Sequence, residues 1–281
     1  MQLESELREA LKKKQLELHY QPIVSPEGKV LLVEALVRWN HPRNGMMQPD
    51  GFVSLAEHTG LIGPMTELVL DQALEKCRQL RHDGRDGFKV AVNLSVRNLM
   101  DSNLPYLVSK LLLKWNLPAD ALQLEITEST IMADPVRAIT TLSALKRMGV
   151  ALSIDDFGTG YSSLSYLKKL PVAEVKIDRS FVMGMSTDEN DGVIVRSVID
   201  LARNLGLEVV AEGIETQEAW DRLVALGCRI GQGYFISRPL PPAELDQWLE
   251  DAAVDAETTR LRRADGVVQL VPRRHASGWS R

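Results

Sequence analysis

Short apolar runs alternate with longer amphipathic stretches along most of the chain. Eight of the short runs have the length and residue types of β-strands, and they lie near residues 17–23, 30–37, 88–93, 121–126, 150–155, 173–177, 208–211 and 228–230. Most of the stretches between them repeat their apolar residues with a helical period. One such set is Ile194, Val198, Leu201 and Leu205, and the following Gly206 predicts the end of that helix.

The first two predicted strands differ from the others in how they are joined. Only residues 25–28 separate them, and such a turn is too short for a parallel crossover, so this pair should be antiparallel. The rest of the pattern is a strand followed by a helix, repeated, which favours a parallel sheet. Because eight strands in one domain favour closure over an open sheet, the sequence predicts an α/β barrel.

The pattern divides the chain into three segments. Residues 1–14 are charged and amphipathic, and they should form an N-terminal helix or linker. Residues 15–250 carry all the predicted strands and form the barrel domain. Residues 251–281 lose the periodicity and gain arginines, such as Arg262, Arg263, Arg273 and Arg274, which predicts a basic, weakly ordered C-terminal tail.

The composition is ordinary for a globular protein, with 281 residues, 44% of them hydrophobic and 25% charged. A formal net charge of −5 gives no reason to expect a nucleic acid polymer as a partner. Cys77 and Cys228 have neither metal nor redox spacing, so we expect a reducing, cytoplasmic setting. No apolar run approaches the roughly 18 residues of a transmembrane helix, so this segment should not span a membrane, although a longer parent protein could be attached to one.

Polar residues interrupt or follow almost every predicted strand. In a parallel barrel the C-terminal ends of the strands open on one face, so residues far apart in sequence can converge there. A single carboxylate at a strand end is often a cap or an ion-pair partner, and adjacent aspartates are common in solvated turns. Recurrence on successive strands favours a shared site instead. The set comprises Glu34, Asn93, Glu125, Asp155, Asp156, Lys176, Glu212 and Gln232.

The chemical types in this set indicate a cation site. Its five carboxylates and the asparagine amide offer oxygen ligands without histidine or cysteine, which suits Mg²⁺ or Mn²⁺ rather than zinc. Two ions would balance most of the charge, and Asp155 or its neighbour could bridge them about 3.5–4 Å apart, as in phosphodiester cleavage. Lys176 could be an ion-pair partner, or it could orient a nucleophile and offset charge on phosphorus.

Seven short motifs carry these residues. They are Glu34-Ala-Leu36, Asn93-Leu-Ser, Glu125-Ile-Thr-Glu128, Asp155-Asp-Phe-Gly-Thr-Gly-Tyr-Ser-Ser-Leu164, Val175-Lys-Ile-Asp178, Ala211-Glu-Gly-Ile-Glu215 and Gln232-Gly-Tyr234. Together they resemble the EAL domain of bacterial cyclic di-GMP phosphodiesterases, over about residues 15–250. The resemblance implies a modified TIM (β/α)8 barrel with an antiparallel first strand. It also implies hydrolysis of cyclic di-GMP to linear pGpG with two Mg²⁺ or Mn²⁺ ions.

The resemblance further implies roles for individual residues. Glu34, Asn93, Glu125 and Asp155 look like ligands of one ion, and Asp155, Asp156 and Glu212 look like ligands of the other. Lys176 resembles the residue that holds the catalytic water, while Glu215 and Gln232 resemble supports for metal-bound water. Whether Glu212 is a general base or only a ligand is left open by the sequence.

The resemblance extends to substrate contacts and to partners. Gln21, Leu36, Arg38 and Asp178 match positions that line the dinucleotide, Gln232 is placed with them, and the Arg38 guanidinium suits a phosphate oxygen. Glu128 resembles the residue that tethers the loop from Asp155 to Leu164. Members of the family often dimerise through the region after the fifth strand, so we expect a homodimer in which Phe157–Leu164 couples the metal site to the neighbouring subunit. An upstream sensory or cyclase domain in a longer parent protein is also expected.

Two other functions remain open from the sequence. Some members of the family bind cyclic di-GMP without cleaving it, and those typically lack a ligand or the loop motif, whereas this chain keeps the whole set. An unrelated metal-dependent barrel enzyme, such as an enolase-type lyase, would use a carboxylic acid and leave cyclic dinucleotides intact. We therefore expect a metal-dependent phosphodiesterase, with a catalytically inactive cyclic di-GMP receptor as the alternative.

Overall fold

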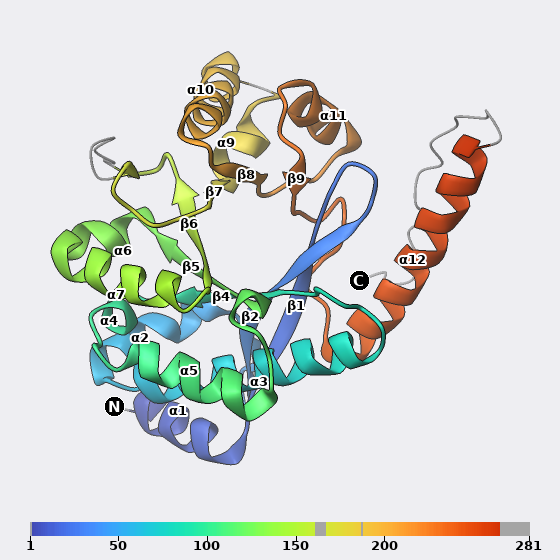
Figure 1. The fold of residues 1–281 in the computed structure, drawn as a ribbon. Coiled ribbons are helices and arrows are strands. Elements are labelled where there is room, and N and C mark those ends of the chain that lie inside the picture. Colours follow the sequence, from blue (N-terminus) through green and yellow to red (C-terminus); the bar gives the residue numbers. More distant parts are fainter. Residues whose placement is uncertain (1, 161–166, 187, 265–281) are drawn as a thin grey trace.

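The strands of the protein form one sheet that closes on itself (Figure 1). This computed structural model describes residues 2–160, 167–186 and 188–264. The strands are β1 (Leu16–Val24), β2 (Val30–His41), β3 (Gly45–Met47), β4 (Val90–Leu94), β5 (Leu122–Thr127), β6 (Ala151–Phe157), β7 (Glu174–Ile177), β8 (Glu208–Ala211) and β9 (Ile230–Gly231). The barrel strands follow the order β1-β9-β8-β7-β6-β5-β4-β2, and β1 also pairs with β2, which closes the barrel. The short β3 pairs with β2 in an antiparallel hairpin.

The first strand is antiparallel to both of its neighbours. It pairs with β2 from Leu16 opposite Trp39 to Val24 opposite Val30, and Val24 also pairs with Gly231 of β9. The other pairings around the barrel, from β2 through β4 to β9, are parallel. The predicted modified TIM barrel with an antiparallel first strand is therefore confirmed.

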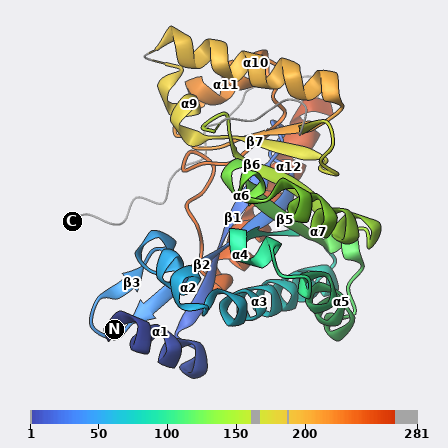
Figure 2. The ribbon, with the colours of Figure 1, turned by 90° about the vertical axis from the view of Figure 1, so that its left-hand side faces the viewer.

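Helices cover the outside of the barrel, with α10 and α11 on the opposite side from α3 and α5 in both views (Figures 1 and 2). The longer ones are α1 (Gln2–Lys13), α3 (Ile62–His82), α5 (Leu104–Trp115), α7 (Pro135–Arg147), α10 (Glu189–Leu205), α11 (Gln217–Ala225) and α12 (Pro242–Ala264). The shorter ones are α2 (Val53–Thr59), α4 (Val96–Leu99), α6 (Glu128–Ala133), α9 (Arg179–Gly184) and the 3-10 turns η1 (Pro49–Gly51) and η2 (Ala119–Ala121). The main apolar core combines strand residues such as Leu124 and Ile154 with helix residues such as Leu70 and Leu142.

A second, smaller apolar cluster is separate from the main core. It consists of Ile23, Leu32, Ala91 and Val210. Side chains two positions apart on a strand share one face of the sheet, so these residues share the face of the polar strand positions and point into the barrel. The interior of the barrel is therefore filled by side chains, as in other barrels of this size.

The observed elements differ from the predicted ones in detail. Strand β3 is absent from the prediction, because three residues that begin with a glycine carry too little alternation to be recognised. Helix α10 ends at Gly206 as predicted, with φ of 70°. Its buried residues are Val195, Val198, Ile199 and Ala202, so the buried face is rotated slightly from the predicted one, and Leu205 is exposed at the helix end.

The two ends of the described chain are both helical. Leu7 and Ala10 of α1 are fully buried in the main core, so this helix packs against the domain. Helix α12 continues past the predicted boundary at residue 250 as far as Ala264, while residues 265–281 lie outside the described residues. The domain limits drawn from the sequence stay a prediction. Within the described ranges, no helix has the length and apolar character needed to cross a membrane.

Candidate active site

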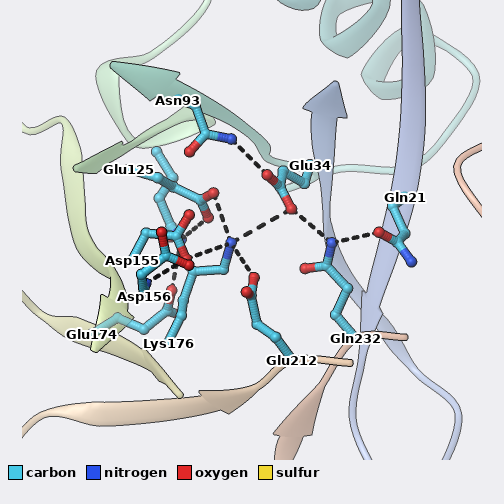
Figure 3. A network of polar contacts seen from close by, with 11 residues as sticks. Gln21, Glu34, Asn93, Glu125, Asp155, Asp156, Glu174, Lys176, Glu212 and Gln232 are labelled. Carbon is cyan, nitrogen blue, oxygen red and sulfur yellow. Dashed lines mark hydrogen bonds and ion pairs between the residues drawn. The ribbon is translucent and has the colours of Figure 1, made fainter. Parts of the chain in front are cut away.

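Lys176 lies among four carboxylates at one end of the barrel (Figure 3). Its Nζ is 2.6 Å from Glu212 Oε1, 2.8 Å from Glu125 Oε2, and 3.4 Å from both Glu34 Oε2 and Asp155 Oδ1. The lysine side chain is completely buried. Burial favours the neutral amine, but the four carboxylates together raise its pKa well above the ordinary value. The carboxylates therefore favour the ammonium form of Lys176, and the convergence predicted from the strand ends is observed.

The cluster holds more negative charge than one lysine neutralises. Burial opposes ionisation of Glu34, but Lys176 and hydrogen bonds from two amides outweigh it and lower the pKa of this carboxyl. Burial and the neighbouring carboxylates, opposed by Lys176, raise the pKa of Glu125 well above its ordinary value and that of Glu212 to about 8. Because several carboxylates share one ammonium, the site retains protons unless further positive charge is supplied.

Two groups of carboxylates are placed to hold cations. Glu34, Glu125 and Asp155 form one, and Asp155, Asp156 and Glu212 form the other. Within each group, one oxygen from each residue lies within 4.8 Å of the others. Asp155 belongs to both groups, as a bridging ligand would. The donors are oxygens and the negative charge is largely buried, so these residues fit hard divalent cations.

A β-bulge brings two adjacent aspartates to the same site. Neighbouring residues on a regular strand point to opposite faces of the sheet. The pairing of β6 with β7 shifts register between Ile154 and Phe157, and Asp156 takes a left-handed backbone conformation with φ of 52°, which aspartate tolerates better than most residues. The bulge thus re-aims the second carboxylate. Burial and the charge of Asp155 raise the pKa of Asp156 to about 6.

Two amide side chains donate hydrogen bonds to Glu34, and a third amide holds one of them. Asn93 Nδ2 donates to Glu34 Oε1 at 2.6 Å, and Gln232 Nε2 donates to Glu34 Oε2 at 2.6 Å. Gln232 Nε2 also donates to Gln21 Oε1 at 2.8 Å, and Gln21 Nε2 in turn donates to Ser237 O at 3.0 Å. These hydrogen bonds connect β1, β2 and β4 with the segment after β9 (Figure 3).

A cavity of about 1140 Å³ opens onto the cluster. Its wall includes Glu215 and all five residues predicted to contact a substrate. These five are Gln21, Leu36, Arg38, Asp178 and Gln232. The structure therefore brings these positions together, while their individual roles stay predictions. Asp178 also caps helix α9, because its Oδ1 accepts a 3.0 Å hydrogen bond from Ser180 N.

Some residues of the cavity wall are absent from the sequence-based set. Asp50, Arg179, Met183 and Tyr234 line the cavity, and the Arg238 guanidinium lies 4.3 Å from the centre of the Tyr234 ring. Tyr234 belongs to one of the seven motifs, so its position in the sequence could have indicated it. Asp50 lies in η1, far from any predicted strand end, and only the folded chain places it here.

Glu128 contacts the start of the segment that follows β6. Gly158 N donates to Glu128 Oε2 at 3.5 Å, and a Cβ added at Gly160 would lie 2.9 Å from Glu128 Cδ. The backbone therefore approaches this buried carboxylate as closely as a glycine permits. The expected contact between Glu128 and the loop exists as far as Gly160, and residues 161–164 of that loop lie outside the described residues.

The fold and the site together define an α/β barrel with a carboxylate cluster that fits hard cations at the C-terminal ends of its strands. The sequence model of the EAL domain matches residues 4–239. The chain belongs to the EAL domain family, and the resemblance found in its motifs is confirmed.

Curated relatives in Pseudomonas aeruginosa are much longer than this chain. One is MucR, named a bifunctional diguanylate cyclase/cyclic di-GMP phosphodiesterase, which is 46% identical over 249 residues that make up 87% of this chain and 36% of MucR. Another is the cyclic di-GMP phosphodiesterase NbdA, 44% identical over 257 residues, 91% of this chain and 33% of NbdA. This chain thus spans about a third of their length.

A solved structure of the MucR phosphodiesterase, a complex with c-di-GMP, has a similar fold. Its TM-score to this chain is 0.85 at 45% sequence identity, and the match covers 87% of this chain and 100% of that one. The similarity in sequence and in structure therefore extends over the whole of that solved domain.

Proposed function

We propose that this chain hydrolyses cyclic di-GMP, breaking one phosphodiester bond to give linear pGpG. The observation that carries the proposal is a fully buried lysine held by four carboxylates beside a cavity of about 1140 Å³. The names of MucR and NbdA include cyclic di-GMP phosphodiesterase, and the similar solved structure is a complex with c-di-GMP. Together these observations support the proposed reaction and substrate.

Two Mg²⁺ or Mn²⁺ ions are the cofactors in this proposal. Glu34, Asn93, Glu125 and Asp155 would hold one ion, and Asp155, Asp156 and Glu212 would hold the other. When bound, such ions lower the pKa of water and stabilise charge on the entering and leaving oxygens of a phosphodiester. The excess of carboxylates over ammonium in the cluster supports this assignment, because it leaves negative charge for cations to balance.

Lys176 and Glu212 are the proposed catalytic residues. The Lys176 ammonium can donate a hydrogen bond to the attacking water and offset the negative charge that develops on phosphorus. Glu212 lies 2.6 Å from Lys176 Nζ and its side chain is 17% exposed, so it can accept a proton from that water. Glu212→Gln separates this role from a ligand role, because glutamine keeps an oxygen ligand but accepts no proton.

The remaining cavity residues bind and orient the dinucleotide. Arg38 supplies a charge-assisted hydrogen bond to a phosphate oxygen, and Leu36 supplies apolar contact. Gln21, Asp178 and Gln232 offer polar atoms to the substrate, and Glu215 helps to hold water near the ions. Their shared position on the cavity wall supports these roles.

Incubation of the chain with cyclic di-GMP and Mn²⁺, followed by chromatography of the nucleotides, tests this function. We expect loss of cyclic di-GMP with matching formation of pGpG, and no reaction in EDTA. Binding of cyclic di-GMP without any pGpG would contradict the enzyme and favour the receptor function. Absence of both binding and turnover would contradict the substrate itself.

We further propose that the chain acts as a homodimer within a longer protein. The length of the curated relatives supports an additional domain, and the name of MucR, which includes diguanylate cyclase, supports a cyclase as one form of it. In the homodimer, the segment Phe157–Leu164 couples the metal site to the neighbouring subunit. Light scattering coupled to gel filtration should give twice the 31.3 kDa mass of this chain, and a monomer at all concentrations would contradict the dimer.

A further inference from the structure

The layer of the barrel interior beneath the site is apolar on one side and polar on the other. Residues two positions before Glu34, Asn93 and Glu212 share their face of the sheet, and they are the apolar Leu32, Ala91 and Val210. Residues two positions before Glu125, Asp155 and Lys176 are instead polar. We call these residues, Gln123, Ser153 and Glu174, the lower polar layer.

The lower polar layer is buried. Gln123 and Glu174 are each 6% exposed, and Ser153 is 0% exposed. A buried polar side chain is destabilising unless it is hydrogen-bonded, and Gln123 Nε2 donates to Glu174 Oε1 at 2.7 Å. Ser153 lies on the strand between these two residues and pairs in register with Glu174. Its small side chain leaves the space in which they meet.

The side-chain amide of Gln123 also faces Glu125 of the cation site. Gln123 Nε2 lies 3.5 Å from Glu125 Oε1, while Glu125 Oε2 accepts from Lys176 Nζ at 2.8 Å. An amide nitrogen has two hydrogens. Since Glu174 takes one, the other is directed at Glu125, and each oxygen of Glu125 then faces a donor. The contact at 3.5 Å is long, so its orientation depends on the shorter bond to Glu174.

We propose that Gln123 and Glu174 are positioning residues of the cation site. Glu174 orients the Gln123 amide, and that amide fixes the plane of the Glu125 carboxylate, which holds a divalent cation. Figure 3 shows Glu174 on the same strand as Lys176, close to the carboxylate cluster. This inference rests on the proposed function only in that Glu125 is a cation ligand.

The variants Gln123→Met and Glu174→Met remove the polar groups with little change in length. Gln123 and Glu174 also line a second cavity of about 650 Å³ near the N-terminal ends of the strands, which gives the substituted side chains room. Glu174→Gln is the conservative variant, because its amide oxygen still accepts from Gln123. Ile23→Ala is the matched control, since it removes a fully buried side chain from the apolar side of the same layer.

Mn²⁺ affinity of the free chain, measured by calorimetry without substrate, is the readout. Outer partners of metal ligands typically contribute 10–100-fold to affinity, so Gln123→Met and Glu174→Met should each weaken Mn²⁺ binding roughly tenfold. The double variant should be little weaker than either single variant, because the two residues act in series. Glu174→Gln should bind as the wild type does, and Ile23→Ala should stay within about twofold although it lowers the melting temperature.

Wild-type Mn²⁺ affinity in folded Gln123→Met would overturn the inference while leaving the proposed function intact. If the losses of Mn²⁺ affinity in the two single variants add up in the double variant, Gln123 and Glu174 act independently. That result would overturn the inference that Glu174 acts through Gln123. If Gln123→Met fails to fold, the comparison of Glu174→Met with Glu174→Gln decides the same question. A wild-type chain that binds no Mn²⁺ would instead count against the proposed function.

Discussion

Lys176 is the residue on which the charge balance of the site depends. Burying an ammonium costs several kcal/mol unless opposite charges and hydrogen bonds compensate for it. Four carboxylates lie within 3.4 Å of Lys176 Nζ and supply that compensation. Removing the lysine would leave them in a buried cluster without a cation of the protein itself. Lys176 therefore stabilises the carboxylate cluster in addition to its proposed catalytic role.

Lys176→Met should reduce kcat about 100-fold, because one charged donor to the developing negative charge is lost. KM for cyclic di-GMP should stay within about threefold, since the lysine acts mainly in the transition state. Steady-state kinetics with Mn²⁺ measures both. Lys76→Met is the matched control, because Lys76 is also buried and pairs with Asp246 at 2.6 Å on another element. A large rise in KM at unchanged kcat would contradict the assigned role.

The raised pKa of Glu212 predicts how the stability of the metal-free chain depends on pH. Burial and neighbouring carboxylates raise its pKa from 4.5 to about 8 in the folded state, so the folded chain keeps a proton that the unfolded chain loses. Stability in EDTA should therefore fall as the pH rises from about 5 to about 8. Mn²⁺ replaces that proton, so it should raise the melting temperature more at about pH 8 than at about pH 6. An equal rise in melting temperature at both pH values would show that Mn²⁺ binding does not displace this proton.

Among the elements, β6 places two adjacent aspartates at the site, and residues Gly158 and Gly160 follow it. The bulge at Asp155 and Asp156 aims both carboxylates at the site, and the next residues lie against Glu128. A displacement of this segment therefore changes the position of two proposed metal ligands. The element connects the site to the region that we propose for dimer contacts.

Gly160→Ala tests the importance of that contact. The added Cβ would lie 2.9 Å from the Glu128 carboxyl, so either this carboxyl or the backbone at Gly160 must shift, and the contact with Gly158 N is disturbed. We expect kcat to fall roughly tenfold, as for other partners that support metal ligands. Gly63→Ala is the control, because no atom lies within 4 Å of its added Cβ. Equal kcat in both variants and in the wild type would show that the contact does not support the site.

For the whole molecule, closure of the barrel is what assembles the site. Gln21 on the antiparallel β1 meets Gln232 because β1 pairs with β9, and Gln232 in turn holds Glu34 of β2. A single network therefore includes residues from both ends of the domain. Opening the barrel at β1 would separate Gln21 and Gln232 from Glu34.

The strands and the convergence of the site could be predicted from sequence because both follow from local alternation. Alternation alone would turn Asp156 away from the site, so the sequence indicated its place through the resemblance, and the structure places it there by a bulge in the pairing of β6 with β7. The contact of Gln123 with Glu174 depends on the stagger of three strands, although alternation alone places both on the interior face. Strand β3 and the wall residue Asp50 lie outside any periodic pattern.

Cyclic di-GMP hydrolysis in oxygen-18 water, with mass spectrometry of the product, shows whether this chain directs water to phosphorus. The wild-type chain with Mn²⁺ should form pGpG carrying a single oxygen-18 atom on its terminal phosphate, because water attacks phosphorus. Bound cyclic di-GMP that stays intact, or a linear product without the label, would rule out attack of water on phosphorus in this site.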